Sequence, residues 1–94
     1  MTDSELREII ISNELITDEQ EVLIANGYAD AFIGITDSEP KRAVYDKNKM
    51  IDILMEEDEV SYLEAIEWLE FNTWNSYMGE STPIYVDTIN NAVR

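Results

Sequence analysis

Residues 31–46 read AFIGITDSEPKRAVYD, and they contain two short β-rich runs with a turn between them. The first run occupies residues 31–35 and the second occupies residues 42–45. Residues 37–40 have the polar and proline-containing composition that favours a turn. This pattern predicts an antiparallel hairpin with a loop of about five or six residues.

A helix is expected before this hairpin, and the segment that follows the helix is ambiguous. Thr2 and Glu5 have the spacing of a capping box, which predicts a helix over residues 3–13. Residues 18–26 combine a capping signal with apolar residues, so they suit either a helical turn or a buried strand. Their periodicity does not decide between these two structures.

Two further helices are expected after the hairpin. Asp46 stands where an N-cap is needed, and a helical apolar stripe follows it over residues 47–57. Ser61 and Glu64 form another capping box, and they open the clearest helix, over residues 62–73 or longer. The acidic run at residues 56–59 ends the first of these helices. Its four carboxylates oppose the helix macrodipole, so we expect fraying there.

These elements predict one small α+β domain. A third β-rich run occupies residues 84–86, and the sequence has no βαβ repeat of the kind that builds a long parallel sheet. We expect a single acidic domain over residues 1–94, with a two- or three-stranded antiparallel sheet and about three helices packed on one face. A domain of this size has modest stability, and dimerisation commonly stabilises such domains. We therefore also expect a homodimer.

The composition excludes several kinds of chemistry. The chain has no cysteine and no histidine, which removes thiolate nucleophiles, zinc–thiolate sites and the commonest general base. No pair of carboxylates stands out as catalytic, and no acidic run has the spacing of a calcium loop. We therefore expect neither an enzyme nor a bound metal or cofactor. The acidic N-terminus and the lack of an apolar run near ~18 residues predict neither a signal peptide nor a membrane span.

Negative charge is the property that points to a function. The chain has 21 acidic and 6 basic residues, which gives a net charge of −15. No lysine or arginine occurs in residues 50–93. Such charge destabilises the compact state by self-repulsion. We therefore expect that the negative charge serves to bind a cationic partner. Anionic lipid and nucleic-acid phosphates would be repelled, so we expect neither a membrane nor direct nucleic-acid binding.

Two groups of carboxylates are candidates for binding that partner. The first is a continuous acidic run: Glu56, Glu57, Asp58 and Glu59. The second has helical spacing: Glu64, Glu67 and Glu70. Successive charges of the second group are about 4.5 Å apart along the helix axis, and one DNA strand presents a phosphate every ~3.4 Å. This face can therefore imitate a nucleic-acid backbone in a basic groove; the alternative for both groups is an ordinary solvated surface.

Aromatic residues in the same region are candidate anchors of an interface, because tryptophan and tyrosine dominate binding energies. The candidates are Trp68, Trp74 and Tyr77. Trp68 lies with Leu63 and Phe71 on a second apolar side of the helix, which suggests burial against the sheet, the first helix or another copy. We expect Phe71 in the core, whereas Trp74 suits the core and an interface equally.

Four of the six basic residues form a cluster around the second β-rich run. They are Lys41, Arg42, Lys47 and Lys49. No glycine-rich phosphate cradle accompanies them, which argues against phosphate binding. We expect them to pair with carboxylates of the same chain, and the alternative is that they pair across a dimer with the acidic patch of a second copy.

A series of short motifs carries a resemblance to a known family. The motifs are GYADAFIGI at 27–35, AVYD at 43–46, ILMEED at 53–58, SYLEAIE at 61–67 and GESTPIYV at 79–86. Their order resembles a widespread family of small, mostly uncharacterised bacteriophage accessory proteins over about residues 21–87. In that family a glycine often stands between the acidic run and the next helix, where this chain has Glu59.

The resemblance implies a phage accessory protein in the host cytoplasm. Inhibitors of host defence are prominent among acidic phage proteins of this size, and inhibitors of the BREX restriction system are the specific case it suggests. The implied partner is the basic surface of a host defence or nucleic-acid-binding protein, of BREX or restriction type, bound by electrostatic docking or DNA mimicry. The alternative is a structural or regulatory phage oligomer whose charge only confers solubility.

Overall fold

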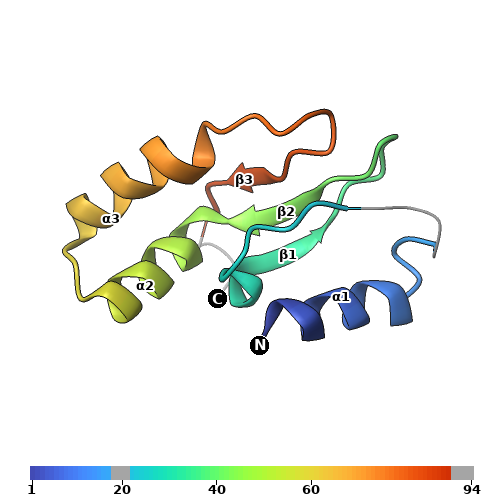
Figure 1. Ribbon diagram of the computed structural model, residues 1–94, viewed down its shortest axis with the longest axis horizontal. Coiled ribbons are helices and arrows are strands. Elements are labelled where there is room, and N and C mark those ends of the chain that lie inside the picture. The colour runs from blue at the N-terminus through green and yellow to red at the C-terminus, as the bar shows by residue number, and fades with distance from the viewer. Residues whose placement is uncertain (18–21, 90–94) are drawn as a thin grey trace.

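The computed structural model describes residues 1–17 and 22–89, which form an α+β fold with a three-stranded sheet (Figure 1). Its elements in chain order are α1 (Asp3–Ser12), β1 (Phe32–Ile35), β2 (Ala43–Asp46), α2 (Lys47–Asp58), α3 (Tyr62–Leu69) and β3 (Ile84–Val86). A 3₁₀ turn over Ala29–Ala31 precedes β1, and a π-helical turn over Glu70–Trp74 continues α3. The three predicted helices and three predicted strands are thus confirmed.

Capping boxes begin α1 and α3, as their sequences predict. At α1, the Thr2 hydroxyl accepts from the Glu5 backbone N–H at 3.1 Å, and a Glu5 carboxylate oxygen accepts from the Thr2 N–H at 2.9 Å. At α3, Ser61 and Glu64 make the same reciprocal pair at 3.2 and 3.1 Å. Each box satisfies two backbone donors that the first helical turn leaves without an intrahelical partner.

Asp46 joins β2 to α2 without a loop, because it is both the last residue of the strand and the N-cap of the helix. Its carboxylate accepts from the Asn48 backbone N–H at 2.9 Å. The helix ends at Asp58, within the acidic run, as predicted. Glu59 then adopts a left-handed conformation, with φ of 53°. Glycine is favoured in this conformation because it has no Cβ to clash. The backbone of Glu59 is therefore strained at this turn, whereas a glycine would adopt the same conformation without strain.

The sheet has the order β1-β2-β3 and is mixed. β1 and β2 form the predicted antiparallel hairpin, and residues 36–42 connect them in a slightly longer loop than expected. β3 pairs with β2 in parallel, so the prediction of a purely antiparallel sheet was wrong. The reason is the connection: α2 and α3 lie between β2 and β3, and such a helical crossover returns the chain in the same direction.

The core lies on the face of the sheet that carries Tyr45. Strand register places Phe32 and Tyr85 on either side of Tyr45, which is fully buried. All three α-helices contribute to the same buried cluster, which includes Leu6 of α1, Met50 and Leu54 of α2, and Ala65 and Leu69 of α3. The helices therefore share one core with this face of the sheet.

Residues 22–25 belong to neither a helix nor a strand, which answers part of the ambiguity left by the sequence. Val22, Ile24 and Ala25 are nevertheless buried. The segment crosses over the sheet (Figure 1), and the Ala25 N–H donates to the Tyr45 phenol oxygen. The ambiguous segment begins with residues 18–21, which lie outside the described residues.

Across 1–17 and 22–89, none of the helices combines the length and apolar character needed to cross a lipid bilayer.

Candidate partner-binding surface

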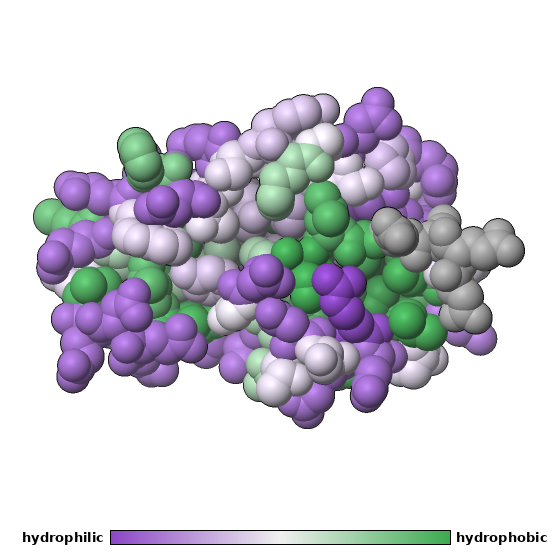
Figure 2. Space-filling view, viewed as in Figure 1, coloured by the Kyte–Doolittle hydropathy of each residue, from purple (hydrophilic) through white to green (hydrophobic). Residues whose placement is uncertain are grey.

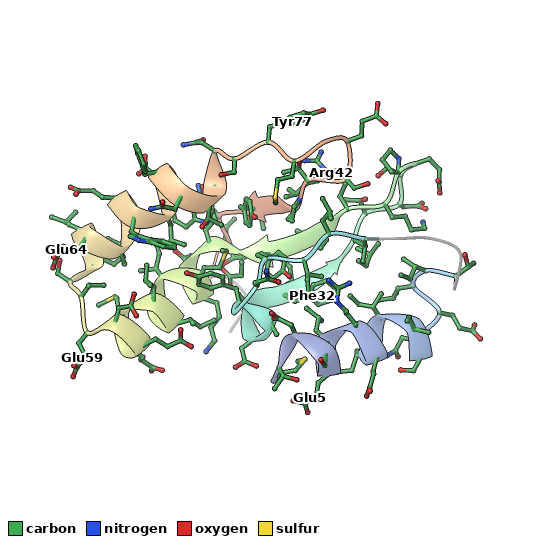
Figure 3. The ribbon with its side chains drawn as sticks, in the orientation of Figure 1. Glu5, Phe32, Arg42, Glu59, Glu64 and Tyr77 are labelled. Carbon is green, nitrogen blue, oxygen red and sulfur yellow. The ribbon has the colours of Figure 1, made fainter. Side chains whose placement is uncertain are left out.

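The acidic run and two members of the second predicted group, Glu64 and Glu67, lie at one end of the molecule, whereas Glu70 follows the end of α3. Glu56, Glu57 and Asp58 occupy the last turn of α2, and the exposed Glu59 follows them. Figure 3 shows Glu59 and Glu64 at this same end, because α3 begins directly after the acidic run and turns back along α2. The structure therefore brings the acidic run and the first turns of α3 together, as a binding surface requires.

Among the described residues, no lysine or arginine forms an ion pair with these carboxylates. Within residues 1–17 and 22–89, the only ion pair joins the Met1 amino group to Asp30, at 2.9 Å. Glu56, Glu57, Asp58 and Glu59 are all exposed to solvent. The negative field at this end of the molecule is therefore available to an outside partner.

The basic cluster makes other contacts, so the expectation that it pairs with carboxylates was wrong for the part of the chain that the structure describes. The Arg42 guanidinium donates through Nε to the Thr82 carbonyl oxygen at 2.6 Å. The Lys47 ammonium lies 4.4 Å from the centroid of the Trp74 ring. Distance keeps Lys47 from the acidic run, because Lys47 opens α2, the run closes it, and a helix of 12 residues is about 18 Å long.

Glu64 has a structural role as well as a charge. Its carboxylate accepts from the Ser61 backbone N–H at 3.1 Å. This hydrogen bond, followed by the one with the Ser61 hydroxyl side chain, lowers the pKa of the Glu64 carboxyl below its ordinary value. Glu64 is therefore ionised and fixed in position by the helix cap, whereas Glu67 and Glu70 are exposed side chains outside the cap.

Apolar side chains emerge beside these carboxylates. Leu63 is 70% exposed, Trp68 is 47% exposed and Phe71 is 87% exposed, so the second apolar side of α3 is uncovered. The prediction that Phe71 belongs to the core was wrong. Leu69 is fully buried, and Phe71 lies about 200° further round the helix, which turns it toward solvent.

A shallow hollow of about 500 Å³ lies along this side of α3, and we call it the α3 groove. Leu54 and Val60 contribute apolar surface to it, together with Trp68 and Phe71. Three carboxylates border it: Asp58, Glu64 and Glu67. Figure 2 shows apolar surface among strongly hydrophilic surface at the end of the molecule where α2 and α3 lie. The groove thus combines an apolar lining with an anionic rim.

The structure separates the other two predicted aromatic anchors from this groove. Trp74 is half-buried against the core, and among the described residues its indole N–H has no hydrogen-bond acceptor. Tyr77 is 79% exposed and lies near Arg42, away from Glu59 and Glu64 (Figure 3). Trp68 is therefore the only predicted aromatic anchor that borders the acidic residues.

Sequence reasoning missed three of the groove residues: Leu54, Val60 and Asn72. Leu54 belongs to the apolar stripe that was expected over residues 47–57, and its burial hides the fact that it also lines the groove. Val60 follows the acidic run as a single apolar residue, which carries no periodic signal. Asn72 also lines the groove, and its spacing of four from Trp68 was the signal that would have found it.

Carboxylate clusters also suggest metal binding, but the described residues contain no group of three or more acidic side chains arranged to hold an ion. Neither a family model nor a curated protein nor a solved structure matches the chain.

Proposed function

We propose that this chain is a phage-encoded acidic protein that binds and inhibits a host anti-phage defence or DNA-processing protein, of BREX or restriction type, in the host cytoplasm. The observation that supports the proposal is the placement of the acidic run beside Glu64 and Glu67 at one end of the molecule. These carboxylates are exposed and, within the described residues, form no ion pair with a lysine or arginine. A basic surface of the target is the partner that this charge distribution fits.

Electrostatics supplies the physical reason. Bringing Glu56 to Glu59 next to Glu64 and Glu67 places like charges together, which opposes folding. A cationic partner removes this repulsion, and the same field accelerates the encounter between the two proteins. A surface of this kind either docks on a basic patch or imitates a nucleic-acid backbone inside a basic groove, and inhibition then follows from occupancy. The proposal includes no enzymatic activity and no cofactor.

The alternative is a structural or regulatory phage oligomer, such as a homodimer, whose charge only confers solubility. One observation favours it: Leu63 and Phe71 are too exposed to contribute to the monomer's core. Such residues are typical of an interface between protein chains. The experiment below separates the two functions because only inhibition depends on the acidic run.

The test is phage infection of a bacterium that carries a BREX or restriction system and expresses the chain. The site variant reverses the acidic run to lysine at positions 56–59. The control variant reverses four carboxylates elsewhere, Glu8, Glu14, Asp37 and Glu39, all of which are exposed. We expect the parent and the control to restore phage growth and the site variant to fail.

Binding to the captured target should also weaken at least about tenfold when salt is raised from about 0.1 M to about 0.5 M, because screening removes the attraction. Equal protection by both variants, or an affinity that salt does not change, would contradict electrostatic docking. A parent that never restores phage growth would contradict inhibition itself.

A further inference from the structure

We infer that the α3 groove binds an amphipathic, positively charged helix of the partner protein. This inference rests on the proposed function and adds to it the chemistry of the segment that the partner presents. It depends on three properties of the groove: its uncovered apolar lining, its anionic rim and the fact that only helices and the turn between them form it.

The most exposed part of the apolar lining adds little to the core of the monomer. Phe71 of the lining is 87% exposed, and Leu63 on the same helix is 70% exposed, so neither side chain gains appreciable burial when the chain folds. Trp68 keeps nearly half of its surface in water while it lines the groove. A partner that covers these side chains removes apolar surface from water, which is the main driving force of association. Phe71 and Trp68 are large aromatic residues of the kind that dominate binding energies.

The anionic rim selects the charge of the partner. Asp58 ends α2, Glu64 caps α3 and Glu67 lies one turn further along, so carboxylates flank the apolar lining. A lysine- or arginine-bearing segment that rests on the lining meets these carboxylates at its edges. A second copy of the chain fits poorly, because a two-fold contact places the same rim against itself and opposes like charges.

The walls of the groove determine the conformation of the bound segment. Every lining residue belongs to α2, to the turn after it, to α3 or to the π-helical turn. An extended peptide binds by adding backbone hydrogen bonds to the edge of a sheet, and this groove contains no strand. A helix instead satisfies its own backbone and presents one apolar face, which is the recognised mode of binding to a hydrophobic groove.

The π-helical turn is consistent with this assignment. Phe71 and Asn72 belong to both the turn and the groove. The Asn75 side-chain amide donates to the Glu70 carbonyl oxygen at 3.0 Å, which helps to hold the turn. Turns of this kind are frequent at functional sites, where they interrupt the regular spacing of a helix.

The test measures binding of synthetic helices to the whole chain. The probe is an amphipathic peptide of leucine and lysine. The two comparison peptides are a leucine–glutamate peptide of the same pattern and a scrambled leucine–lysine peptide without an apolar face. We expect the amphipathic basic peptide to bind at least about tenfold more tightly than either of the others, and its NMR shift changes to concentrate at residues 54–72.

Variants then separate the groove from general charge. Phe71→Ser removes an exposed apolar side chain from the groove, and Leu63→Ser removes another exposed apolar side chain from α3. Ile33→Ser is the matched control, because Ile33 is 54% exposed and lies on β1. We expect Phe71→Ser to raise the dissociation constant about tenfold and Ile33→Ser to change it less than about twofold. Unchanged circular dichroism and melting temperature verify that each variant is folded.

The rim is tested in the same way. Asp58→Asn with Glu67→Gln removes two charges from the groove, and Glu5→Gln with Glu8→Gln removes two from α1, which lies at the other end of the molecule (Figure 1). Only the first pair should weaken binding and reduce its salt dependence. Equal weakening by both pairs, or equal binding of the scrambled peptide, would contradict binding in the groove. Either result would mean that only diffuse attraction between charges holds the peptide.

Two outcomes distinguish this inference from the proposed function. If Phe71→Ser inhibits host defence as well as the parent does while reversal of Glu56 to Glu59 abolishes inhibition, the groove is not the docking site and the proposed function stands. If the basic helix binds in the groove but the parent never inhibits defence, the proposed function fails instead. Concentration-dependent dimers that Phe71→Ser dissociates would assign the groove to a second copy and overturn the inference.

Discussion

The phenol oxygen of Tyr45 accepts a hydrogen bond of 2.9 Å from the backbone N–H of Ala25. This bond joins the centre of the sheet to the irregular segment 22–25, whose residues have no strand partner of their own. Both groups are buried, so water does not replace the bond if it is lost. A buried donor without an acceptor destabilises the fold by its full desolvation penalty.

The change Tyr45→Phe tests this relationship. It retains the ring and its edge-to-face contact with Phe32, and it leaves the Ala25 N–H without an acceptor. We expect the free energy of unfolding to fall by about 1–3 kcal/mol, measured by urea denaturation. Tyr85→Phe is the control, since Tyr85 is only half-buried, and it should change stability by about 0.5 kcal/mol or less. Equal losses in both variants would show that the Ala25 bond contributes nothing specific.

Tyr45 should also control stability at alkaline pH. Burial raises the pKa of Tyr45 to about 12 from its ordinary value of 10.0. The folded state therefore holds this proton more tightly than the unfolded state does. Stability is complete below about pH 10 and falls as the pH rises toward 12, by roughly 2 kcal/mol. Urea denaturation between these pH values should show a shallower decline in Tyr45→Phe. Burial also raises the pKa values of Tyr28 and Tyr85, so part of the decline should persist.

Short-range signals account for the features that the sequence predicts correctly. The capping boxes at Thr2 and Ser61 depend on residues three positions apart, and the β1–β2 hairpin depends on a turn between adjacent runs. The two groups of carboxylates can be recognised in the sequence because their members are consecutive or have helical spacing, whereas their meeting at one end of the molecule was not predicted. The features recognised in this way are local, so the sequence contains all the information that determines them.

Features that depend on distant contacts were predicted less well. The parallel pairing of β3 depends on where the α2–α3 connection returns the chain, and long-range bonds such as Arg42 to Thr82 support it. The exposure of Phe71 depends on the rotation of α3 against the core. The groove itself arises from the turn between two helices. None of these relationships has a fixed spacing in the sequence.

The bond between Arg42 and Thr82 gives a prediction about β3. Arg42 is half-buried, and its Nε donates to the Thr82 carbonyl oxygen just before β3 begins. Arg42→Met keeps the aliphatic stem and removes this charge-assisted bond, so we expect a loss of about 1.5–3 kcal/mol in the free energy of unfolding. The neighbouring Lys41→Met makes the same charge change and should stay within about 0.5 kcal/mol of the parent. Hydrogen exchange of the β3 amides should accelerate only in the Arg42 variant.

Glu59 gives a prediction of the opposite sign. Its left-handed φ of 53° is unfavourable for a residue with a Cβ, and its charge lies in a run of like charges. Glu59→Gly should raise the free energy of unfolding by about 0.5–1 kcal/mol, because relief of the Cβ clash exceeds the added entropy of the unfolded chain. Glu59→Ala removes the same charge and keeps the Cβ. A thermal melt that shows equal stabilisation in both variants would assign the effect to charge and contradict backbone strain.

Glu64 allows its role in the helix cap to be separated from its role as a charge. Ser61→Ala removes the N-cap side chain and should lower the free energy of unfolding by about 1 kcal/mol. Glu64→Gln keeps an acceptor for the Ser61 N–H, because glutamine also completes a capping box. The lowered pKa of Glu64 means that its contribution to stability is present above the ordinary value of 4.5 and is lost as the pH falls through the lowered value. Urea denaturation on the acid side should therefore be less pH-dependent in Glu64→Gln.

The Glu64→Gln variant also tests binding to the partner. Glu5→Gln is the matched control, because Glu5 caps α1 in the same way and its pKa is lowered by the equivalent bond from Thr2. Both variants should show the same loss of acid sensitivity, since both carboxylates perform the same capping role. Only Glu64→Gln should bind the basic helix more weakly, because only Glu64 borders the groove. If Glu5→Gln weakens binding as much, proximity to the groove has no effect, and attraction comes from net charge alone.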